Sequence, residues 1–388
     1  MYLDSAATTK PNEAVVKAMQ PYFTIMWHNP SSLYNPSKAV RKDVESARQT
    51  VANYINAEKD EIYFTSGGSE SNCWAIQGFI QNRKSHGREP FIITTPIEHK
   101  SIVDCVERID VDFLYVKVDD EGFVDMKSLE SSLKVATGQV RNNEDVLVSI
   151  MFANNEIGTI QHIRQIADLV HKYGAVFHTD AVQAFGQVSI DVKLLNVDML
   201  SVSGHKIHTP KGIGFLYKKN SVEINPLIYG SQEGGLRGGT ENVPYIMGFK
   251  KAVELLQKHE FDRQMSMTLW RDDLIARLKA MGCIIHGSLS ERLPNNINIA
   301  FPQKATGEAL IYMLDTSGIY ISAGSACNSH STSISHVLQA IGLSEDEALR
   351  TIRITLSDTV PYEERESLTE HFISEFKKQL KILDISQA

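Results

Sequence analysis

An alternation of buried strands and amphipathic helices in the middle of the chain constrains the fold most strongly. Residues 145–152 form a continuous apolar run, which is typical of a buried strand. Apolar positions on one helical face follow it, namely Ile160, Ile163, Ile166, Ala167 and Val170. Gly174 is a natural end for that helix, and a second strand through 176–178 comes directly after it. A strand, helix and strand in this order predict parallel pairing through a right-handed crossover.

The same alternation extends over most of the chain and predicts an α/β fold with two domains. Residues 61–65 and 91–95 predict further strands, so we assign residues 12–250 to one large, mainly parallel α/β domain. Residues 251–280 carry a long helical pattern. Shorter elements are predicted after it, with strands at 296–301, 319–322 and 351–356, and helices at 307–316, at 335–341 and from 362. We assign residues 1–11 and 251–388 to a smaller α+β domain, although the N-terminal strand alone fits either domain.

Charge and composition exclude several classes of protein. A formal net charge of −8 argues against a generic nucleic-acid-binding surface. No apolar run approaches the ~18 residues of a membrane span, and the start, MYLDSAATTK, lacks the pattern of a signal peptide. The four cysteines show no close paired spacing that would predict disulfides or a CxxC metal site. We therefore expect a cytoplasmic protein with reduced thiols and with no direct nucleic-acid or membrane partner.

Two predicted strands end in residues that can support chemistry. The apolar run 197–202 leads into small and polar residues and then into Lys206. The strand through 176–178 leads into Asp180 and Gln183, and Asp180 precedes Lys206 by 26 positions. A lysine for a Schiff base and a carboxylate for a protonated ring nitrogen suit pyridoxal phosphate. A plain ion pair between Asp180 and Lys206 is the alternative that these residues leave open.

A glycine pair after the strand 61–65 predicts an anion-binding turn. In the stretch Phe64 to Asn72, Gly67 and Gly68 let the backbone approach a ligand, and Ser69 can cap the following helix. Free N–H groups and the helix dipole favour an anion there. The turn lacks the lysine of a Walker A loop, and many structural turns look alike. Ser203 and His205, beside Lys206, supply further donors for a phosphate.

Several motifs in one order resemble the cysteine desulfurases of the NifS/IscS type, which have the class V, type I aminotransferase fold. They are TSGGSESN (65–72), NNEIG (154–158), HTDAVQAFG (178–186), SGHKIHTPKGIGFLY (203–217), RGGTENV (237–243) and GSACNS (324–329). The likeness runs from YLDSAATT (2–9) to IRITLS (352–357), nearly end to end. It implies a pyridoxal phosphate enzyme with a large and a small domain.

The resemblance also assigns the residues around the cofactor ring. Lys206 would carry the cofactor covalently, and Asp180 would pair with its ring nitrogen. Gln183 would bond the phenolic oxygen, near which Asn155 would lie beside the substrate. His99 would lie against the ring and shuttle protons.

The cofactor phosphate and the substrate carboxylate have their own implied partners. The phosphate would be held by Gly68, Ser69, Ser203 and His205, and by Thr240 of a second copy of the chain. The resemblance therefore implies a homodimer. Arg353 would bind the α-carboxylate of the substrate, a task that suits the two-pronged guanidinium.

Cys327 carries the chemistry that distinguishes this family. Its neighbours, SAGSACNSHSTS (322–333), are small and polar, which is typical of a loop rather than a packed core. The resemblance implies that its thiolate takes sulfur from L-cysteine as a persulfide while L-alanine is released. The sulfur would then pass to an acceptor protein for iron–sulfur cluster assembly, tRNA thiolation or DNA phosphorothioation. A small packed cysteine is the alternative.

Other interpretations remain open beside this one. A second enzyme function on the same fold is a selenocysteine lyase or an aminotransferase, and a third possibility is a non-catalytic scaffold. A metal site is not expected, because His330 and His336 near Cys327 have no familiar zinc spacing. The other cysteines, Cys73, Cys105 and Cys283, are expected to be core residues.

Three stretches depart from the family pattern without removing a catalytic group. The usual NPSS-x-H-x-x-G continues here as Leu33-Tyr34-Asn35-Pro36-Ser37 after the serines. The usual YGPKG is part of IHTPKG (207–212), and the usual RSGT is RGGT (237–240). The departures leave the sulfur acceptor open.

Overall fold

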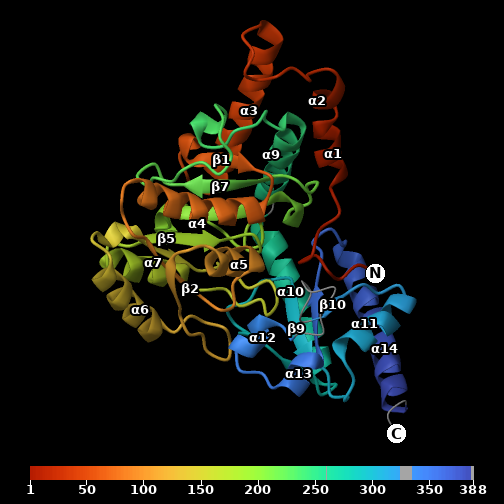
Figure 1. Cartoon of the computed structure of the whole chain (residues 1–388). Coiled ribbons are helices and arrows are strands. Elements are labelled where there is room, and N and C mark those ends of the chain that lie inside the picture. Colours follow the sequence, from red (N-terminus) through yellow and green to blue (C-terminus); the bar gives the residue numbers. More distant parts are fainter. Residues whose placement is uncertain (259, 324–333, 386–388) are drawn as a thin grey trace.

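The computed structural model describes residues 1–258, 260–323 and 334–385, and these form two β-sheets with helices around them (Figure 1). The large sheet lies in the upper part of Figure 1, and the small sheet lies below it beside both ends of the chain. The mixed α/β fold predicted from the sequence is confirmed. The division into domains at the predicted residues stays a prediction.

The large sheet has seven strands in the order β1-β7-β6-β5-β4-β2-β3. Their bounds are β1 (Ile62–Thr65), β2 (Phe91–Thr94), β3 (Asp112–Tyr115), β4 (Val146–Ser149), β5 (Val176–Asp180), β6 (Met199–Ser203) and β7 (Gly214–Lys218). All pairs from β6 to β3 are parallel, as predicted. β7 runs against both of its neighbours, because the ten residues 204–213 are too few for a crossover and return the chain beside β6.

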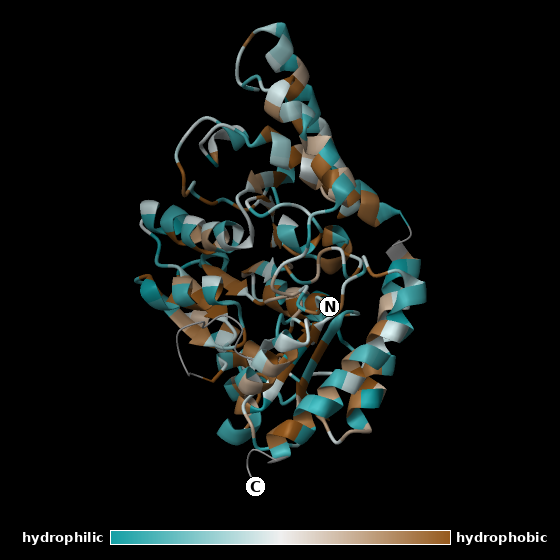
Figure 2. Ribbon diagram, turned by 90° about the vertical axis from the view of Figure 1, so that its right-hand side faces the viewer, coloured by the Kyte–Doolittle hydropathy of each residue, from teal (hydrophilic) through white to brown (hydrophobic). Residues whose placement is uncertain are grey.

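Helices cover both faces of this sheet, because alternate strand residues point to opposite sides. Ile92, Leu147 and Val176 pack with α4 (Gly68–Ser85) and α5 (Lys100–Arg108). Their chain neighbours on the same strands pack in the cluster that includes the other helices around this sheet. These are α1 (Glu13–Met19), α3 (Asn35–Tyr54), α6 (Met126–Gln139), α7 (Ile163–Lys172) and α9 (Val243–Gln257), with the short α2 (Pro21–Thr24) and α8 (Val192–Leu195) at the periphery. Figure 2 shows the apolar residues gathered on the strands and the inner helix faces.

The small sheet has four antiparallel strands in the order β10-β11-β9-β8. They are β8 (Ile284–Ile285), β9 (Asn296–Ala300), β10 (Ser322–Ala323) and β11 (Thr351–Thr355). The helices on this side are α10 (Glu260–Lys279), α11 (Gly307–Thr316), α12 (His336–Ala340), α13 (Glu345–Leu349) and α14 (Tyr362–Ile385). The N-terminus joins this part of the molecule, since Tyr2 and Asp4 form parallel bridges to Tyr320 and Thr355 and Leu3 lies in its core.

Two predicted elements differ in the structure. The helical pattern over 251–280 belongs to two helices, α9 and α10, because Lys258 takes an extended conformation at the end of α9. Apolar residues resume at once beyond the break, so the pattern alone did not reveal it. The strand predicted at 319–322 is the two-residue β10, Ser322–Ala323, which pairs with β11, whereas Tyr320 forms a bridge to Tyr2.

A buried ion pair fixes the glycine-rich segment that leads to Thr240. Two nitrogens of Arg48 on α3 donate to the two carboxylate oxygens of Glu233 at 2.7 and 2.9 Å. The same carboxylate accepts the backbone N–H of Phe64 on β1 at 3.0 Å. A two-pronged pair of this kind fixes position as well as charge, so the start of the segment is tied to α3 and β1. Within the described ranges, no helix is long and apolar enough to cross a membrane.

Candidate active site

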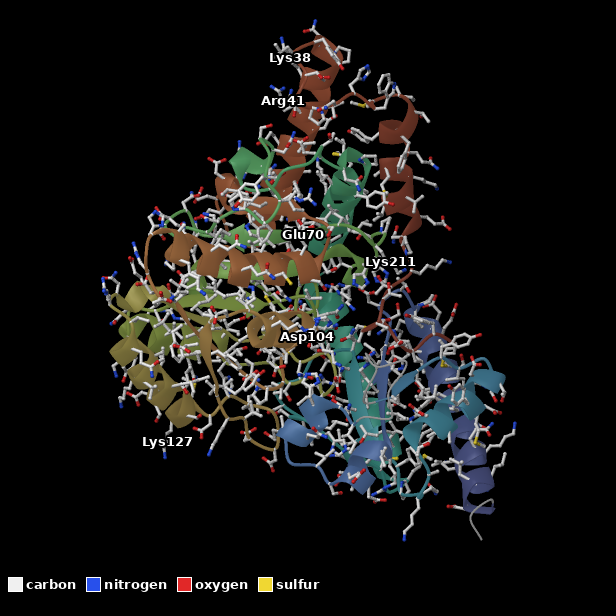
Figure 3. All side chains as sticks on the ribbon, in the orientation of Figure 1. Lys38, Arg41, Glu70, Asp104, Lys127 and Lys211 are labelled. Carbon is white, nitrogen blue, oxygen red and sulfur yellow. The ribbon has the colours of Figure 1, made fainter. Side chains whose placement is uncertain are left out.

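A cavity of about 310 Å³ opens at the carboxyl ends of β4, β5 and β6. Open α/β sheets commonly bind ligands at this edge. Glu70 on α4 and Asp104 on α5 are labelled in Figure 3 and mark the two helices beside it. The lining residues are Ala6, Ala7, Gly68, Ser69, Asn72, His99, Met151, Ala153, Asn155, Asp180, Val182, Gln183, Ser203, His205, Lys206 and Arg353. Of the predicted site residues that the structure describes, all except Thr240 line this cavity.

Lys206 follows β6 in a short 3-10 turn, Gly204–Lys206. Its amino group donates hydrogen bonds to the backbone carbonyls of Ala6 and Ala7, the latter at 2.9 Å. Gln183 donates to the Ala6 carbonyl as well, at 3.2 Å. The N-terminal segment thus lies across the cavity and positions the lysine. Sequence reasoning gave this segment no role in the site.

Asp180 ends β5 and is buried. One carboxylate oxygen accepts from the side-chain amide of Asn72 at 2.7 Å, and the other accepts from the backbone N–H of Val182 at 2.8 Å. Burial raises the pKa of Asp180, while the nearby His99, these two donors and Lys206 oppose that rise. A buried carboxylate in such a position is stabilised by a cationic partner, and a protonated ring nitrogen is one.

His99 caps the N-terminus of α5 and lines the cavity. Its Nδ1 accepts from the backbone N–H of Ser101 at 3.1 Å and lies 2.8 Å from the Ser101 hydroxyl. Burial lowers the pKa of His99, and the positive charge of Lys206 lowers it further, against the opposing effect of Asp180. His99 is therefore a neutral imidazole near neutral pH.

The turn between β1 and α4 forms a cradle for an anion. Gly67 caps α4 with φ of 152°, which a residue with a side chain rarely adopts, and a Cβ on Gly68 would lie 2.5 Å from Val182 Cγ2. The backbone of this turn can therefore come close to a ligand, at the positive end of the helix dipole. The prediction that Ser69 caps the helix is wrong, because Gly67 takes that position and leaves Ser69 exposed in the first turn.

The other donors of the predicted phosphate site lie on the loop after β6. Ser203 ends the strand, and His205 Nδ1 lies 3.1 Å from the hydroxyl of Thr8. Burial lowers the pKa of His205 to about 4, and the charges of Lys206 and Lys211 act in the same direction. His205 is consequently neutral at pH 7 and can give a hydrogen bond from a protonated ring nitrogen.

Arg353 reaches the cavity from β11 of the small sheet and is buried. One guanidinium nitrogen donates to the backbone carbonyl of Asn155 at 3.2 Å, and another donates to the carboxylate of Asp4 at 2.8 Å. Its Nε has no hydrogen-bond partner among the described residues. The arginine thus joins the small sheet to the loop after β4 at the edge of the cavity.

The predicted persulfide residue, Cys327, lies outside the described residues. The residues on either side of that segment lie at the site, since Ser322 pairs with Arg353 across β10 and β11. On the other side, Ser335 donates to the buried carboxylate of Glu156, and His336 Nε2 lies 2.9 Å from the Glu98 carbonyl.

Thr240 and the remaining cysteines lie away from the cavity lining. Thr240 is exposed and borders a neighbouring hollow together with Arg237. Cys105 and Cys283 are buried as expected, and burial raises the pKa of Cys283 to about 12. Cys73 was expected in the core but is only half-buried, and a hydrogen bond with Cys105 lowers its pKa to about 7.

Asn72 and Ser101 belong to the hydrogen-bond network of the site, and sequence reasoning missed both. Asn72 ends the TSGGSESN motif, and its amide binds both Asp180 and the hydroxyl of Ser101. The signal that could have found it is its place one helical turn after Gly68, on the side of α4 that faces the anion cradle.

The residues present fit pyridoxal phosphate. A lysine beside a buried carboxylate suits covalent attachment of the cofactor and protonation of its ring nitrogen. The turn at Gly67 and Gly68 suits a phosphate held by backbone N–H groups, because a side chain at Gly68 would clash with Val182.

Known proteins with similar sequences and structures agree with this assignment. The family model described as aminotransferase class-V matches residues 1–366. A cysteine desulfurase IscS of Clostridium botulinum is 43% identical over 364 residues, which are 92% of this chain and 89% of that protein. A cysteine desulfurase IscS of Methanosarcina thermophila is 42% identical over 361 residues, with 92% and 87% covered.

Solved structures agree as well. A NifS-like protein superimposes with a TM-score of 0.87 at 34% identity, over 99% of both chains. A structure of SspA in complex with cysteine gives a TM-score of 0.75 at 34% identity, over 92% of this chain and 98% of that one. The chain therefore belongs to the class-V aminotransferase family, which depends on pyridoxal phosphate, and within it to the cysteine desulfurases.

Proposed function

We propose that the protein removes sulfur from L-cysteine, releases L-alanine and carries the sulfur as a persulfide on Cys327. The observation that carries this proposal is one cavity lined by Lys206 and Asp180 from the ends of β6 and β5 and by Arg353 from β11. The solved relative with bound cysteine supports the choice of substrate.

Different residues of the cavity would bind different parts of the cofactor. Lys206 would bind it covalently, Asp180 would keep a proton on its ring nitrogen, and Gln183 and Asn155 would bind its phenolic edge. Backbone and side-chain donors of Gly68, Ser69, Ser203 and His205 hold the phosphate, as the geometry of the turn supports. When bound, pyridoxal phosphate withdraws electrons from the substrate carbons, which makes the sulfur displaceable.

Substrate orientation and sulfur capture fall to three further residues. Arg353 binds the α-carboxylate of cysteine and so sets which bond faces the cofactor. His99 lines the same cavity and transfers protons during the reaction. The thiolate of Cys327 attacks the sulfur of the substrate as the bond from the β-carbon to that sulfur breaks. The electron pair of the broken bond stays on the carbon side, which takes up a proton to become the methyl group of alanine, and the sulfur remains on Cys327 as a persulfide.

We further propose that the enzyme is a cytoplasmic homodimer that passes its sulfur to another protein. The family resemblance supports the dimer, because Thr240 lies outside the cavity of its own chain and would serve the cavity of a partner. The acceptor belongs to iron–sulfur cluster assembly, tRNA thiolation or DNA phosphorothioation.

Borohydride reduction should attach the cofactor permanently to Lys206. Reduction converts the bond between a lysine amine and the cofactor into one that survives digestion, so peptide mapping by mass spectrometry can locate it. We expect the added mass on the peptide that contains Lys206. Lys211 and Lys100 serve as internal controls, and label on either of them would refute the assignment.

Replacement of the persulfide residue, Cys327→Ser, should separate binding from sulfur transfer. The cofactor and the substrate contacts are unchanged, whereas the sulfur acceptor is lost. Spectral changes on adding cysteine should persist, and alanine and sulfide formation should disappear. Cys283→Ser is the matched control and should retain turnover. Normal sulfide release with dithiothreitol by the Cys327→Ser enzyme would contradict the role of this thiol.

The substitution Arg353→Ala removes the two-pronged guanidinium and should lower kcat/KM by roughly 30- to 1000-fold. A charge-assisted two-pronged pair is worth on the order of 2–4 kcal/mol in the transition state. Arg353→Lys keeps the charge but not the fork, so it should recover only part of the loss. Cofactor absorbance should be unchanged in both variants. A defect restricted to cofactor occupancy would make Arg353 a structural residue instead.

Dilution should dissociate the dimer and release the cofactor together, because Thr240 of the partner would leave with a phosphate hydrogen bond. Sedimentation in the analytical ultracentrifuge, with cofactor absorbance recorded in the same run, measures both. Thr240→Ala should weaken cofactor retention in the intact dimer, whereas Thr137→Ala on α6 should not. A monomer with full cofactor occupancy and activity would show that each site is complete in one chain.

A further inference from the structure

A chain of hydrogen bonds connects Asp180 to His99 through Asn72 and Ser101. The Asn72 amide nitrogen lies 2.7 Å from Asp180 Oδ2 and 3.0 Å from the Ser101 hydroxyl. That hydroxyl lies 2.8 Å from His99 Nδ1. The residues come from α4, α5 and β5, so the connection exists only in the folded chain.

The donor and acceptor atoms of each group determine which group donates in the hydrogen bonds of Asn72. An ionised Asp180 can only accept hydrogen bonds, so the nitrogen of the Asn72 amide must face it. That nitrogen carries two hydrogens, and its two partners are Asp180 and the Ser101 hydroxyl. The Ser101 oxygen is therefore an acceptor toward Asn72, and its own hydrogen remains available to donate.

The same reasoning fixes the last bond. The backbone N–H of Ser101 points at His99 Nδ1 at 3.1 Å, because His99 caps α5 with this nitrogen. An N–H group cannot point at a nitrogen that carries hydrogen, so Nδ1 must present its lone pair. The Ser101 hydroxyl, 2.8 Å away, donates to that lone pair as well.

His99 must then carry its hydrogen on the other ring nitrogen, Nε2. The groups that act on it electrostatically include Lys206 and His336, which favour the neutral ring, and Asp180 and Asp104, which favour the charged one. Burial is the strongest effect and keeps the ring neutral. A neutral imidazole has a single N–H hydrogen, and Nδ1 cannot hold it.

We propose that Asn72 and Ser101 are positioning residues that hold His99 with its hydrogen on Nε2, so that His99 begins the reaction as a hydrogen-bond donor and not as a base. The inference rests on the proposed function for its consequence in catalysis, but the position of the hydrogen is a property of the folded protein itself. The imidazole of His99 therefore has two contacts in the structure: it lines the cavity, and its Nδ1 caps the N-terminus of α5.

Nitrogen NMR of the holoenzyme tests the hydrogen position directly. Histidine labelled with nitrogen-15 distinguishes a ring nitrogen that carries hydrogen from one that does not, and the His99 signals are assigned by their absence from the His99→Gln spectrum. At neutral pH we expect a bare Nδ1 and a protonated Nε2. A His99 ring with hydrogen on Nδ1 would overturn the proposal.

Variants of Ser101 test whether the positioning matters for catalysis. Ser101→Ala removes one donor to Nδ1, so kcat for alanine formation should fall about three- to ten-fold, the effect of one hydrogen bond. KM should not change, because Ser101 does not line the cavity. Ser101→Thr keeps the hydroxyl and should restore kcat. Ser85→Ala, at the far end of α4, is the matched control and should behave as the wild type.

The outcomes separate this proposal from the proposed function. An unchanged kcat in Ser101→Ala would refute the positioning role even if the tautomer is as expected. If Ser101→Ala does not fold, the tautomer of the wild-type protein still decides the proposal. A wild-type enzyme that forms no alanine from cysteine would refute the proposed function. The NMR measurement of the hydrogen on Nε2 does not depend on this activity, so it would still test the position of the hydrogen.

Discussion

The carboxylate of Asp180, buried at the end of β5, is the constraint on which the rest of the site depends. Taking a carboxylate out of water costs several kcal/mol unless hydrogen bonds and a positive partner compensate for it. Asn72 on α4 and the backbone after β5 supply the hydrogen bonds. A correct parallel sheet with α4 packed on it is therefore a requirement for a stable Asp180, and the same packing places the anion cradle at the start of α4 next to Lys206.

The second constraint is that the site lies where the two sheets meet. Arg353 belongs to the small sheet but binds the Asn155 carbonyl after β4 and the carboxylate of Asp4 at the other end of the chain. Lys206 belongs to the large sheet but donates to the carbonyls of the same N-terminal segment. Three parts of the chain, far apart in sequence, thus fix one another, and Lys206 and Arg353 are both positioned by the N-terminal segment.

The sequence predicted the strand ends that carry the site, and it missed one long-range contact and two local details of helix ends. Asp180 and Lys206 were predictable because both follow apolar runs, and strand ends in a parallel sheet meet at one edge. Asn72 was not predictable, since its partners Ser101 and Asp180 lie 29 and 108 residues away. The break at Lys258 was missed because the apolar pattern continues across it. The capping residue was misplaced because Gly67, without a side chain, takes the position expected for Ser69.

The departures from the family pattern fall into two physical classes. His208 is half-buried directly after the Lys206 turn, with φ of 63°. The strain of that conformation is offset locally, because its ring binds Asp358 at 2.7 Å and its backbone N–H binds the hydroxyl of Thr9. Leu33, by contrast, is 83% exposed, so most of its apolar side chain is in contact with solvent. The first change is accommodated by the interior beside Lys206, whereas the second lies on the surface, and neither replaces a predicted site residue.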